Sequence, residues 1–273
     1  MLVQKFGGTS VADAAGFQAC AEVVRRHAGD HQVIVVLSAV KGVTDLLLAA
    51  IDAAADDLEL DGPLDKIIGL ESAVVEGLGE AGMDIFQAER DLAHREKRLR
   101  TRLEGIRLLG SCPDTARAEI LASGERFSSR LMALYLRHLG LEARWSDADI
   151  LPPTSDKILD TLLDQEAAEP LLREALENSQ VLVLPGFYSR NEGGGYQLLG
   201  RNGSDYTAAA VAASLGADAC QIWKDVDGFF TADPRVVRNA RLLKEVSFEE
   251  AMELSYFGAR MIHSQSLVPA MEA

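Results

Sequence analysis

The chain has 273 residues, 48% of them hydrophobic, and a formal net charge of -15 at pH 7. This length can bury a sizeable apolar core in one large domain or two smaller ones. The negative charge argues against a nucleic-acid-binding surface, because phosphate backbones are bound through clustered lysines and arginines. Nucleotide binding stays open, because a nucleotide needs only a few cations and backbone N–H groups at one place.

The hydrophobic residues lie in short runs such as Val33 to Leu37, and none approaches the roughly 18 apolar residues of a membrane-spanning helix. Met1 is followed almost directly by the first expected strand, which leaves no room for a secretion signal. We therefore expect a cytoplasmic protein without a membrane partner. The cysteines lie far apart, without a CxxC pair, so we expect buried, reduced thiols and no protein-bound metal at Cys20, Cys112 and Cys220.

Apolar runs rich in β-branched residues alternate with segments of helical period. This alternation predicts an α/β fold with a mainly parallel central sheet. The expected strands are Leu2 to Phe6, Gln32 to Ser38, Glu142 to Ser146, Gln180 to Pro185 and Cys220 to Lys224. The expected helices are Ala14 to His27, most of Leu64 to Leu109, a segment that follows Glu125 and runs to about His138, and Ala208 to Ser214.

Two further segments bear on the organisation of the chain. The charge-dense stretch Glu89 to Arg102 predicts a solvated helix face without chemistry. The glycines Gly193 to Gly195 predict a tight hairpin between apolar runs, and we place a boundary beside it that divides the chain into 1–185 and 186–273. From Met261 a helical pattern begins that no strand follows, which predicts a second half truncated at its C-terminus.

The first expected strand runs directly into the segment Lys5 to Ser10, which reads KFGGTS. Adjacent glycines after a strand let the backbone approach an anion closely, and their N–H groups can point at phosphate oxygens. Lys5 adds a positive charge at the strand end. The segment is neither a Walker A loop nor a GxGxxG fingerprint, which argues against a nicotinamide-dependent oxidoreductase. The glycines are also compatible with helix packing alone.

Two more segments carry candidate ligand-binding residues. The second expected strand ends at Ser38 and continues through Gly42 to Thr44, and ligands of open α/β sheets bind outside such carboxyl ends. Ser38 and Thr44 are equally typical of helix caps. Glu125, within the sequence SGE, is either a first-turn charge that complements a helix dipole or a carboxylate that pairs with a ligand ammonium group.

The densest group of polar residues precedes the alanine-rich helical segment. A loop that brings Arg201, Ser204 and Asp205 to a helix N-terminus can bind one anion by its guanidinium group and another on backbone N–H groups. Helix capping alone would need only one of Ser204 and Asp205. Further on, Asp225 to Gly228 ends a strand in two acids, which is typical of an ordinary turn as well as of a nucleotide site.

Taken together, these segments resemble the aspartate kinase branch of the amino acid kinase family. The resemblance covers the whole chain and is closest to the kinase portion of bifunctional aspartate kinase–homoserine dehydrogenases. It rests on motifs that occur in the family's order: KFGGTS at Lys5 to Ser10, LSA at Leu37 to Ala39, SGE at Ser123 to Glu125, GRNGSDYTAA at Gly200 to Ala209, DVDG at Asp225 to Gly228, DPR at Asp233 to Arg235 and SYFGA at Ser255 to Ala259.

The resemblance implies a three-layer α/β/α sandwich, with the amino-acid substrate over 1–185 and ATP over 186–273. The implied reaction transfers the γ-phosphoryl group of MgATP to the side-chain carboxylate of L-aspartate, the first step of lysine, threonine and methionine biosynthesis. Lys5 would neutralise charge on the transferred group, and Asp205 would orient Lys5. The substrate carboxylate is already ionised at neutral pH, so no general base is expected. A homodimer is also implied.

The implied site residues fall into two sets. Those for aspartate are Thr44, Glu125, Arg201 and Ser204. Those for ATP are Lys5, Gly7, Gly8, Thr9, Ser38, Lys224, Asp225, Phe230, Arg235 and Arg260.

The chain departs from the family's usual residues in its nucleotide half. The departures are Lys224 for Thr or Ser, Phe230 for Tyr, Arg260 for Lys, and Ser264 for the Pro that follows His263. They leave a second interpretation open, a non-catalytic or truncated relative that binds aspartate or nucleotide as a regulator. Retention of Lys5, Arg201 and Asp205 favours the enzyme, because binding alone would not require a lysine aimed at a transferring phosphate.

Overall fold

The computed structural model describes residues 1–177, 179–232, 236–256, 262 and 264–273. Its centre is a parallel sheet with the strand order β3-β4-β2-β1-β7. The strands are β1 (Leu2–Phe6), β2 (Val33–Leu37), β3 (Ala143–Trp145), β4 (Val181–Pro185) and β7 (Ala219–Trp223). Each predicted strand is confirmed to within one residue at either end. Because β7 pairs with β1, the two segments 1–185 and 186–273 share one sheet.

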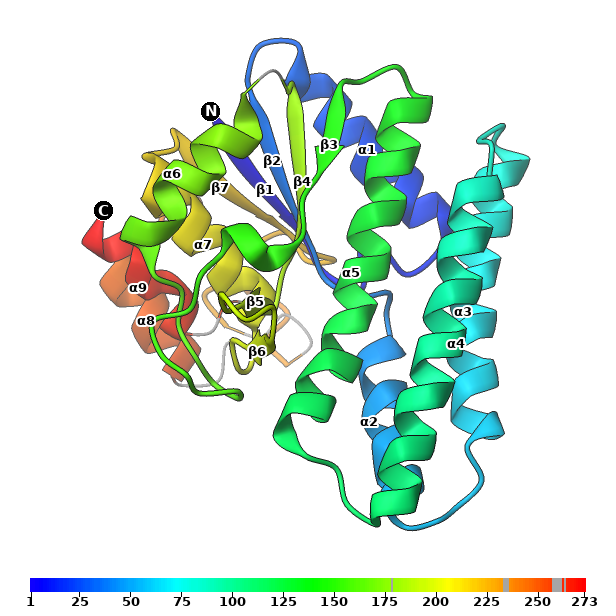
Figure 1. Cartoon of the computed structure of the whole chain (residues 1–273). Coiled ribbons are helices and arrows are strands. Elements are labelled where there is room, and N and C mark those ends of the chain that lie inside the picture. Colours follow the sequence, from blue (N-terminus) through cyan, green and yellow to red (C-terminus); the bar gives the residue numbers. More distant parts are fainter. Residues whose placement is uncertain (178, 233–235, 257–261, 263) are drawn as a thin grey trace.

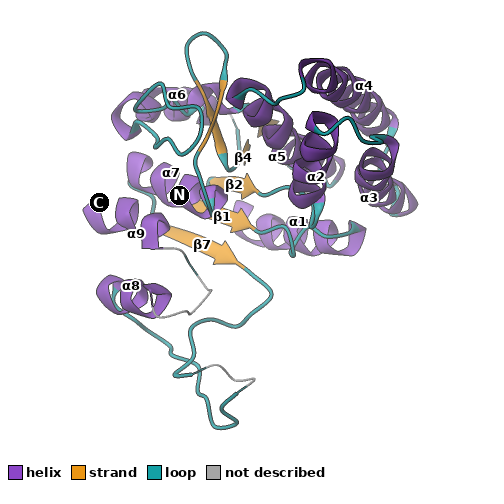
Figure 2. Cartoon of the chain, turned by 90° about the horizontal axis from the view of Figure 1, so that it is seen from below, coloured by secondary structure: helices purple, strands orange, loops and turns teal. Residues whose placement is uncertain are grey.

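Helices cover both faces of the sheet and give the expected three-layer sandwich (Figures 1 and 2). One layer contains α1 (Ala14–Ala28) and α5 (Asp114–His138), and the other contains α6 (Gln165–Leu176) and α7 (Gly203–Leu215). Outside α7 lies α9 (Ser264–Glu272), which in turn contacts α8 (Phe248–Tyr256). No described helix combines the length and the apolar character that crossing a bilayer requires.

A helical bundle extends beyond the sheet at the end where the strands finish (Figure 1). It is built from the first part of α5 with α2 (Val43–Ala55), α3 (Asp61–Glu80) and α4 (Phe86–Leu109). Apolar side chains such as Leu47, Leu64 and Leu103 are fully buried between these helices. The long helices predicted between Leu64 and Leu109 are thus confirmed, with a break at 81–85.

The charge-dense stretch of α4 is only partly the solvated face that its composition predicts. Arg95 is buried and pairs with Glu71 of α3, which is fully buried. An arginine at this position faces the bundle because it lies on the same side of α4 as the buried Leu92 and Leu99. The prediction of a wholly solvated face is therefore wrong at Arg95.

The helix that carries Glu125 begins earlier than the sequence indicates. Since α5 starts at Asp114, Glu125 lies in its middle, and the interpretation of Glu125 as a first-turn charge is wrong. Gly124 looks like a helix breaker but serves close packing, because a methyl group there would lie 2.8 Å from Cβ of Ala39. The loop after β2 therefore presses directly against α5.

The predicted hairpin is confirmed. Strands β5 (Tyr188–Arg190) and β6 (Tyr196–Leu198) pair in antiparallel fashion around the three glycines. The three cysteines are free thiols, but only Cys20 is buried, while Cys112 and Cys220 are partly exposed.

Candidate active site

A cleft of about 520 Å³ opens at the carboxyl ends of the central strands. It is formed by the loops after β1 and β2, the middle of α5, the turn after β4, the start of α7 and the end of β7. Its volume is in the range of small-molecule sites. The sequence-predicted residues that line it are Lys5, Gly7, Gly8, Thr9, Ser38, Thr44, Glu125, Arg201, Ser204, Lys224 and Asp225.

Lys5, near the end of β1, lines the base of the cleft. Lys5 is 6% exposed and forms an ion pair with Asp205. Asp205 lies in the first turn of α7 and is 3% exposed. Nζ of Lys224 lies 3.0 Å from the other oxygen of the same carboxylate. One carboxylate thus faces two ammonium groups at the base of the cleft. Burial lowers the pKa of Lys5, although the Asp205 carboxylate acts in the opposite direction.

The two glycines after β1 allow two loops to meet. A methyl group on Gly8 would lie 2.9 Å from the carbonyl oxygen of Ala39, so a larger residue would force the loops after β1 and β2 apart. The backbone N–H of Ser10 donates to the carbonyl oxygen of Gly7 at 2.9 Å, which closes the turn. This compact turn lets an anion approach both the backbone and the ammonium group of Lys5.

The N-termini of two helices point at the cleft without side-chain caps. The N-cap residue of α2 is Gly42 and that of α7 is Asn202, and neither helix start has a capping hydrogen bond from a side chain. The interpretation of Ser38, Thr44, Ser204 or Asp205 as N-caps is therefore wrong. The uncapped N–H groups are available to an anion in the cleft, and the partial positive charge of each helix start favours one.

Glu125 forms the opposite wall of the cleft. It is 4% exposed, and burial raises its pKa to about 8, against the opposing effects of a hydrogen bond from the Ala39 backbone and of nearby Arg95 and Lys5. Its Oε2 atom is buried and has no hydrogen-bond partner among the described residues. A buried carboxylate with an unused oxygen is suited to a cationic ligand group, which would satisfy the oxygen and favour its ionised form.

The turn after β4 adds a residue that sequence reasoning missed. Phe187 lines the cleft with φ of 74°, a conformation that bulky residues rarely adopt. Its N–H donates to Oγ1 of Thr207 at 3.2 Å. A methyl group on neighbouring Gly186 would lie 2.6 Å from Cβ of Ser204, so this turn and the start of α7 are in close contact. Lys41 and Asp45 also line the cleft although the sequence did not single them out, and Asn202 lines it from within the GRNGSDYTAA motif.

Of the predicted nucleotide residues that the structure describes, one is not brought into the cleft. Phe230 is absent from its lining and instead forms an isolated bridge with Leu242. Arg235 and Arg260 lie outside the described residues.

The comparison with known families assigns the fold. The amino acid kinase family matches the chain over residues 1–273. The chain belongs to this family. The amino acid kinase is 35% identical over 279 residues to the bifunctional aspartokinase/homoserine dehydrogenase of Haemophilus influenzae, across 99% of the chain and 34% of that relative. It is 33% identical over 284 residues to lysine-sensitive aspartokinase 3 of Escherichia coli, across 100% of the chain and 60% of that relative.

A solved structure shows the same similarity in three dimensions. The chain superposes on E. coli aspartokinase III in complex with aspartate and ADP with a TM-score of 0.87 and 31% identity, covering 100% of this chain and 60% of that one. The chain therefore spans between about a third and three fifths of these relatives' length.

Proposed function

We propose that this amino acid kinase is an aspartate kinase, which transfers the γ-phosphoryl group of MgATP to the side-chain carboxylate of L-aspartate and forms 4-phospho-L-aspartate. The observation that carries the proposal is the group of Lys5, Asp205 and Lys224 beneath two uncapped helix N-termini, facing the buried carboxylate of Glu125. The similarity to aspartokinases, one of them solved with aspartate and ADP, supports the same assignment.

The amino-acid pocket would lie between α5 and the start of α7. The substrate ammonium group would pair with Glu125, and the guanidinium group of Arg201 can hold the α-carboxylate through two parallel hydrogen bonds. Thr44 and Ser204 line the same space and supply hydroxyl groups. A substrate with a blocked amine would leave Glu125 unpaired, so this pocket favours a free amino acid.

The nucleotide would approach from the β7 side. Its phosphates would lie over the turn at Gly7 to Thr9 and near Ser38, with Lys224 and Asp225 beside them. We retain Phe230, Arg235 and Arg260 as proposed ATP contacts from the family resemblance alone. The division into an amino-acid segment 1–185 and an ATP segment 186–273 stays a prediction, and each proposed pocket draws its residues equally from both segments.

The chemistry follows from charge and positioning. The aspartate carboxylate is an ionised nucleophile at neutral pH, so the protein need not remove a proton. Phosphoryl transfer then depends on holding the reactants in line and on neutralising the charge of the transferred group. The ammonium group of Lys5 can supply the positive charge that offsets it, and the ion pair with Asp205 would orient that ammonium group.

A magnesium ion fits this cleft as a companion of the nucleotide. Mg²⁺ commonly keeps several waters and binds through one or two carboxylates together with substrate phosphates, and Asp45 and Asp225 line the cleft. In the described part of the chain, no group of three or more His, Cys, Asp or Glu side chains could hold a metal ion alone. When bound, the ion would offset charge on the phosphates.

Product trapping tests the identity of the acceptor. An acyl phosphate reacts with hydroxylamine to give a hydroxamate. The products formed by phosphorylating an alcohol or a phosphate give no hydroxamate. With MgATP we expect hydroxamate from L-aspartate and at most background from N-acetyl-L-glutamate or uridine monophosphate. Equal product from N-acetyl-L-glutamate would overturn the assignment of the acceptor while leaving kinase activity intact.

We also propose a homodimer, on the strength of the family resemblance, and retain the cytoplasmic location that the sequence analysis expects. Sedimentation velocity on the purified chain tests the assembly. A single species at the 29.5 kDa of one chain, at the concentration used for activity, would contradict it.

A further inference from the structure

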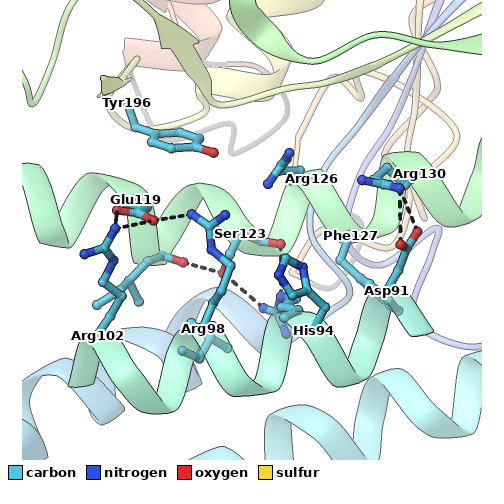
Figure 3. A pocket seen from close by; sticks show the side chains of 13 residues that line it. Asp91, His94, Arg98, Arg102, Glu119, Ser123, Arg126, Phe127, Arg130 and Tyr196 are labelled. Carbon is cyan, nitrogen blue, oxygen red and sulfur yellow. Dashed lines mark hydrogen bonds and ion pairs between the residues drawn. The ribbon is translucent and has the colours of Figure 1, made fainter. Parts of the chain in front are cut away.

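A second pocket lies outside the candidate active site, between α4, α5 and strand β6 (Figure 3). Its volume is about 80 Å³. It is lined by the side chains of five arginines, namely Arg95, Arg98, Arg102, Arg126 and Arg130. An adjoining hollow shares part of this lining and adds Arg190 from β5. Such a concentration of guanidinium groups stands out in a chain whose formal net charge is -15.

The described ion pairs leave part of this positive charge unbalanced. Arg95 pairs with Glu71, and Arg130 lies 3.0 Å from Asp91, so these two arginines are matched one to one. The other arginines share their carboxylate partners. Glu119 and Asp147 each form ion pairs with two arginines.

Glu119 lies 2.5 Å from Arg98 and 2.9 Å from Arg102. Asp147 lies 3.0 Å from Arg126 and 3.4 Å from Arg190. Four guanidinium groups therefore face two carboxylates, which leaves a surplus of two positive charges.

The surplus guanidinium groups keep hydrogen-bonding capacity. Their side chains are 46% exposed at Arg98, 51% at Arg102, 32% at Arg126 and 26% at Arg190. Each guanidinium has five N–H donors, and a shared carboxylate cannot accept them all. In Figure 3, the guanidinium group of Arg98 from α4 extends toward the ring of Tyr196 from below, and that of Arg126 from α5 lies to one side of the ring.

Apolar and aromatic groups enclose this charged space. Leu99, Ile120 and Phe127 line it, and Tyr196 covers one side. The guanidinium carbon of Arg190 lies 5.1 Å from the centre of the Tyr196 ring, which holds that arginine in a stacked position. Partial exclusion of water strengthens the attraction between guanidinium groups and an anion.

The pocket is separate from the cleft described above. Helix α5 forms a wall of both, with Arg126 and Phe127 facing the arginine-lined pocket and Glu125 facing the cleft. Apart from α5, the two sites share no element.

We propose that this arginine-lined pocket binds a phosphate-class dianion, either inorganic phosphate or the phosphoryl group of a small phosphomonoester. The surplus of two positive charges matches a dianion. Guanidinium groups that approach from α4, α5 and β5 suit an anion with several oxygens better than a carboxylate with two. The pocket is small beside the cleft of about 520 Å³, so the phosphoryl group would occupy it and the rest of an ester would extend outward.

Calorimetric titration of the whole chain with inorganic phosphate at low ionic strength tests the site. Replacing Arg98 or Arg126 by glutamine removes one surplus charge and should weaken phosphate binding about tenfold, the loss expected for one charge-assisted hydrogen bond. The matched control is Arg100→Gln, an equally exposed arginine of α4 that pairs with Asp61 and Glu96 and does not line the pocket. It should bind phosphate like the wild type. Thermal unfolding checks that all variants are folded.

The control also accounts for phosphate bound in the cleft. The wild type and the three variants share any phosphate binding in the cleft. A difference in phosphate affinity between R98Q or R126Q and R100Q therefore reports on the arginine-lined pocket. Phosphate binding that is equal in all variants, or absent in the wild type, would overturn the proposal. A parallel titration with glycerol 3-phosphate separates the two sources: tighter binding than phosphate identifies an ester, and weaker binding identifies the free ion. Binding of a polyglutamate peptide without binding of either phosphate would instead identify a protein-docking surface and refute the site.

Discussion

Glu125 is a buried acidic side chain, and in the absence of a bound cation its surroundings favour the neutral carboxylic acid. Burial raises its pKa to about 8, so in the free protein the side chain is mostly protonated at pH 7. Pairing with the ammonium group of L-aspartate would favour the ionised form, and binding would then release a proton. We expect the affinity for L-aspartate to increase as the pH rises from about 6 to about 8.

Isothermal titration across this pH range measures the effect, and repeating it in buffers of different ionisation enthalpy counts the released proton. Glu125→Gln should bind L-aspartate at least about tenfold more weakly and without this pH dependence. An affinity that does not change with pH in the wild type would show that Glu125 does not bind the ammonium group.

The same carboxylate affects stability. Because its pKa is higher in the folded than in the unfolded state, the folded protein binds more protons between these two values. The stabilisation is fully present below the ordinary value of 4.5 and is lost as the pH rises through about 8. The free energy of unfolding should therefore fall across this window, and urea denaturation should show a shallower fall in Glu125→Gln. A steeper fall in the variant would contradict the assigned pKa direction.

At the scale of elements, the packing of α5 against the loop after β2 places Glu125 in the cleft. Gly124→Ala would put a methyl group 2.8 Å from Cβ of Ala39, and relieving this contact should cost about 1–3 kcal/mol. Gly105→Ala in α4 is the matched control, since no atom lies within 4 Å of the added methyl group. There the better helix propensity should stabilise by about 1 kcal/mol. Urea unfolding distinguishes the two, and stabilisation by both changes would refute close packing at Gly124.

Strands were predictable from the sequence, whereas the start of α5 was not. Runs such as VIVVL in β2 are apolar and β-branched because parallel strands are buried on both faces. Glycine in a helical pattern usually indicates a boundary, and the close contact with Ala39 accounts for Gly124 within the helix. Long-range contacts of this kind leave no local signal.

At the scale of the whole molecule, sequence motifs indicated the cleft because parallel strands bring their carboxyl ends to one edge. Lys5, Glu125 and Asp205 are far apart in the chain, yet each lies within a motif that could be recognised beforehand. The arginine-lined pocket could not be predicted in this way. Its composition depends on how α4, α5 and the β5–β6 hairpin meet, and its arginines look like ordinary solvated charges in the sequence.

The most direct test of the proposed aspartate kinase is ADP production by the purified chain with MgATP, measured with and without L-aspartate. Turnover should depend on aspartate and fall by about 10² to 10³ in Lys5→Ala, which removes the charge aimed at the transferred phosphoryl group. Lys66→Ala, an exposed lysine of α3, should retain wild-type turnover. No aspartate-dependent turnover in a folded protein that still binds aspartate would contradict the account and favour a non-catalytic, regulatory relative.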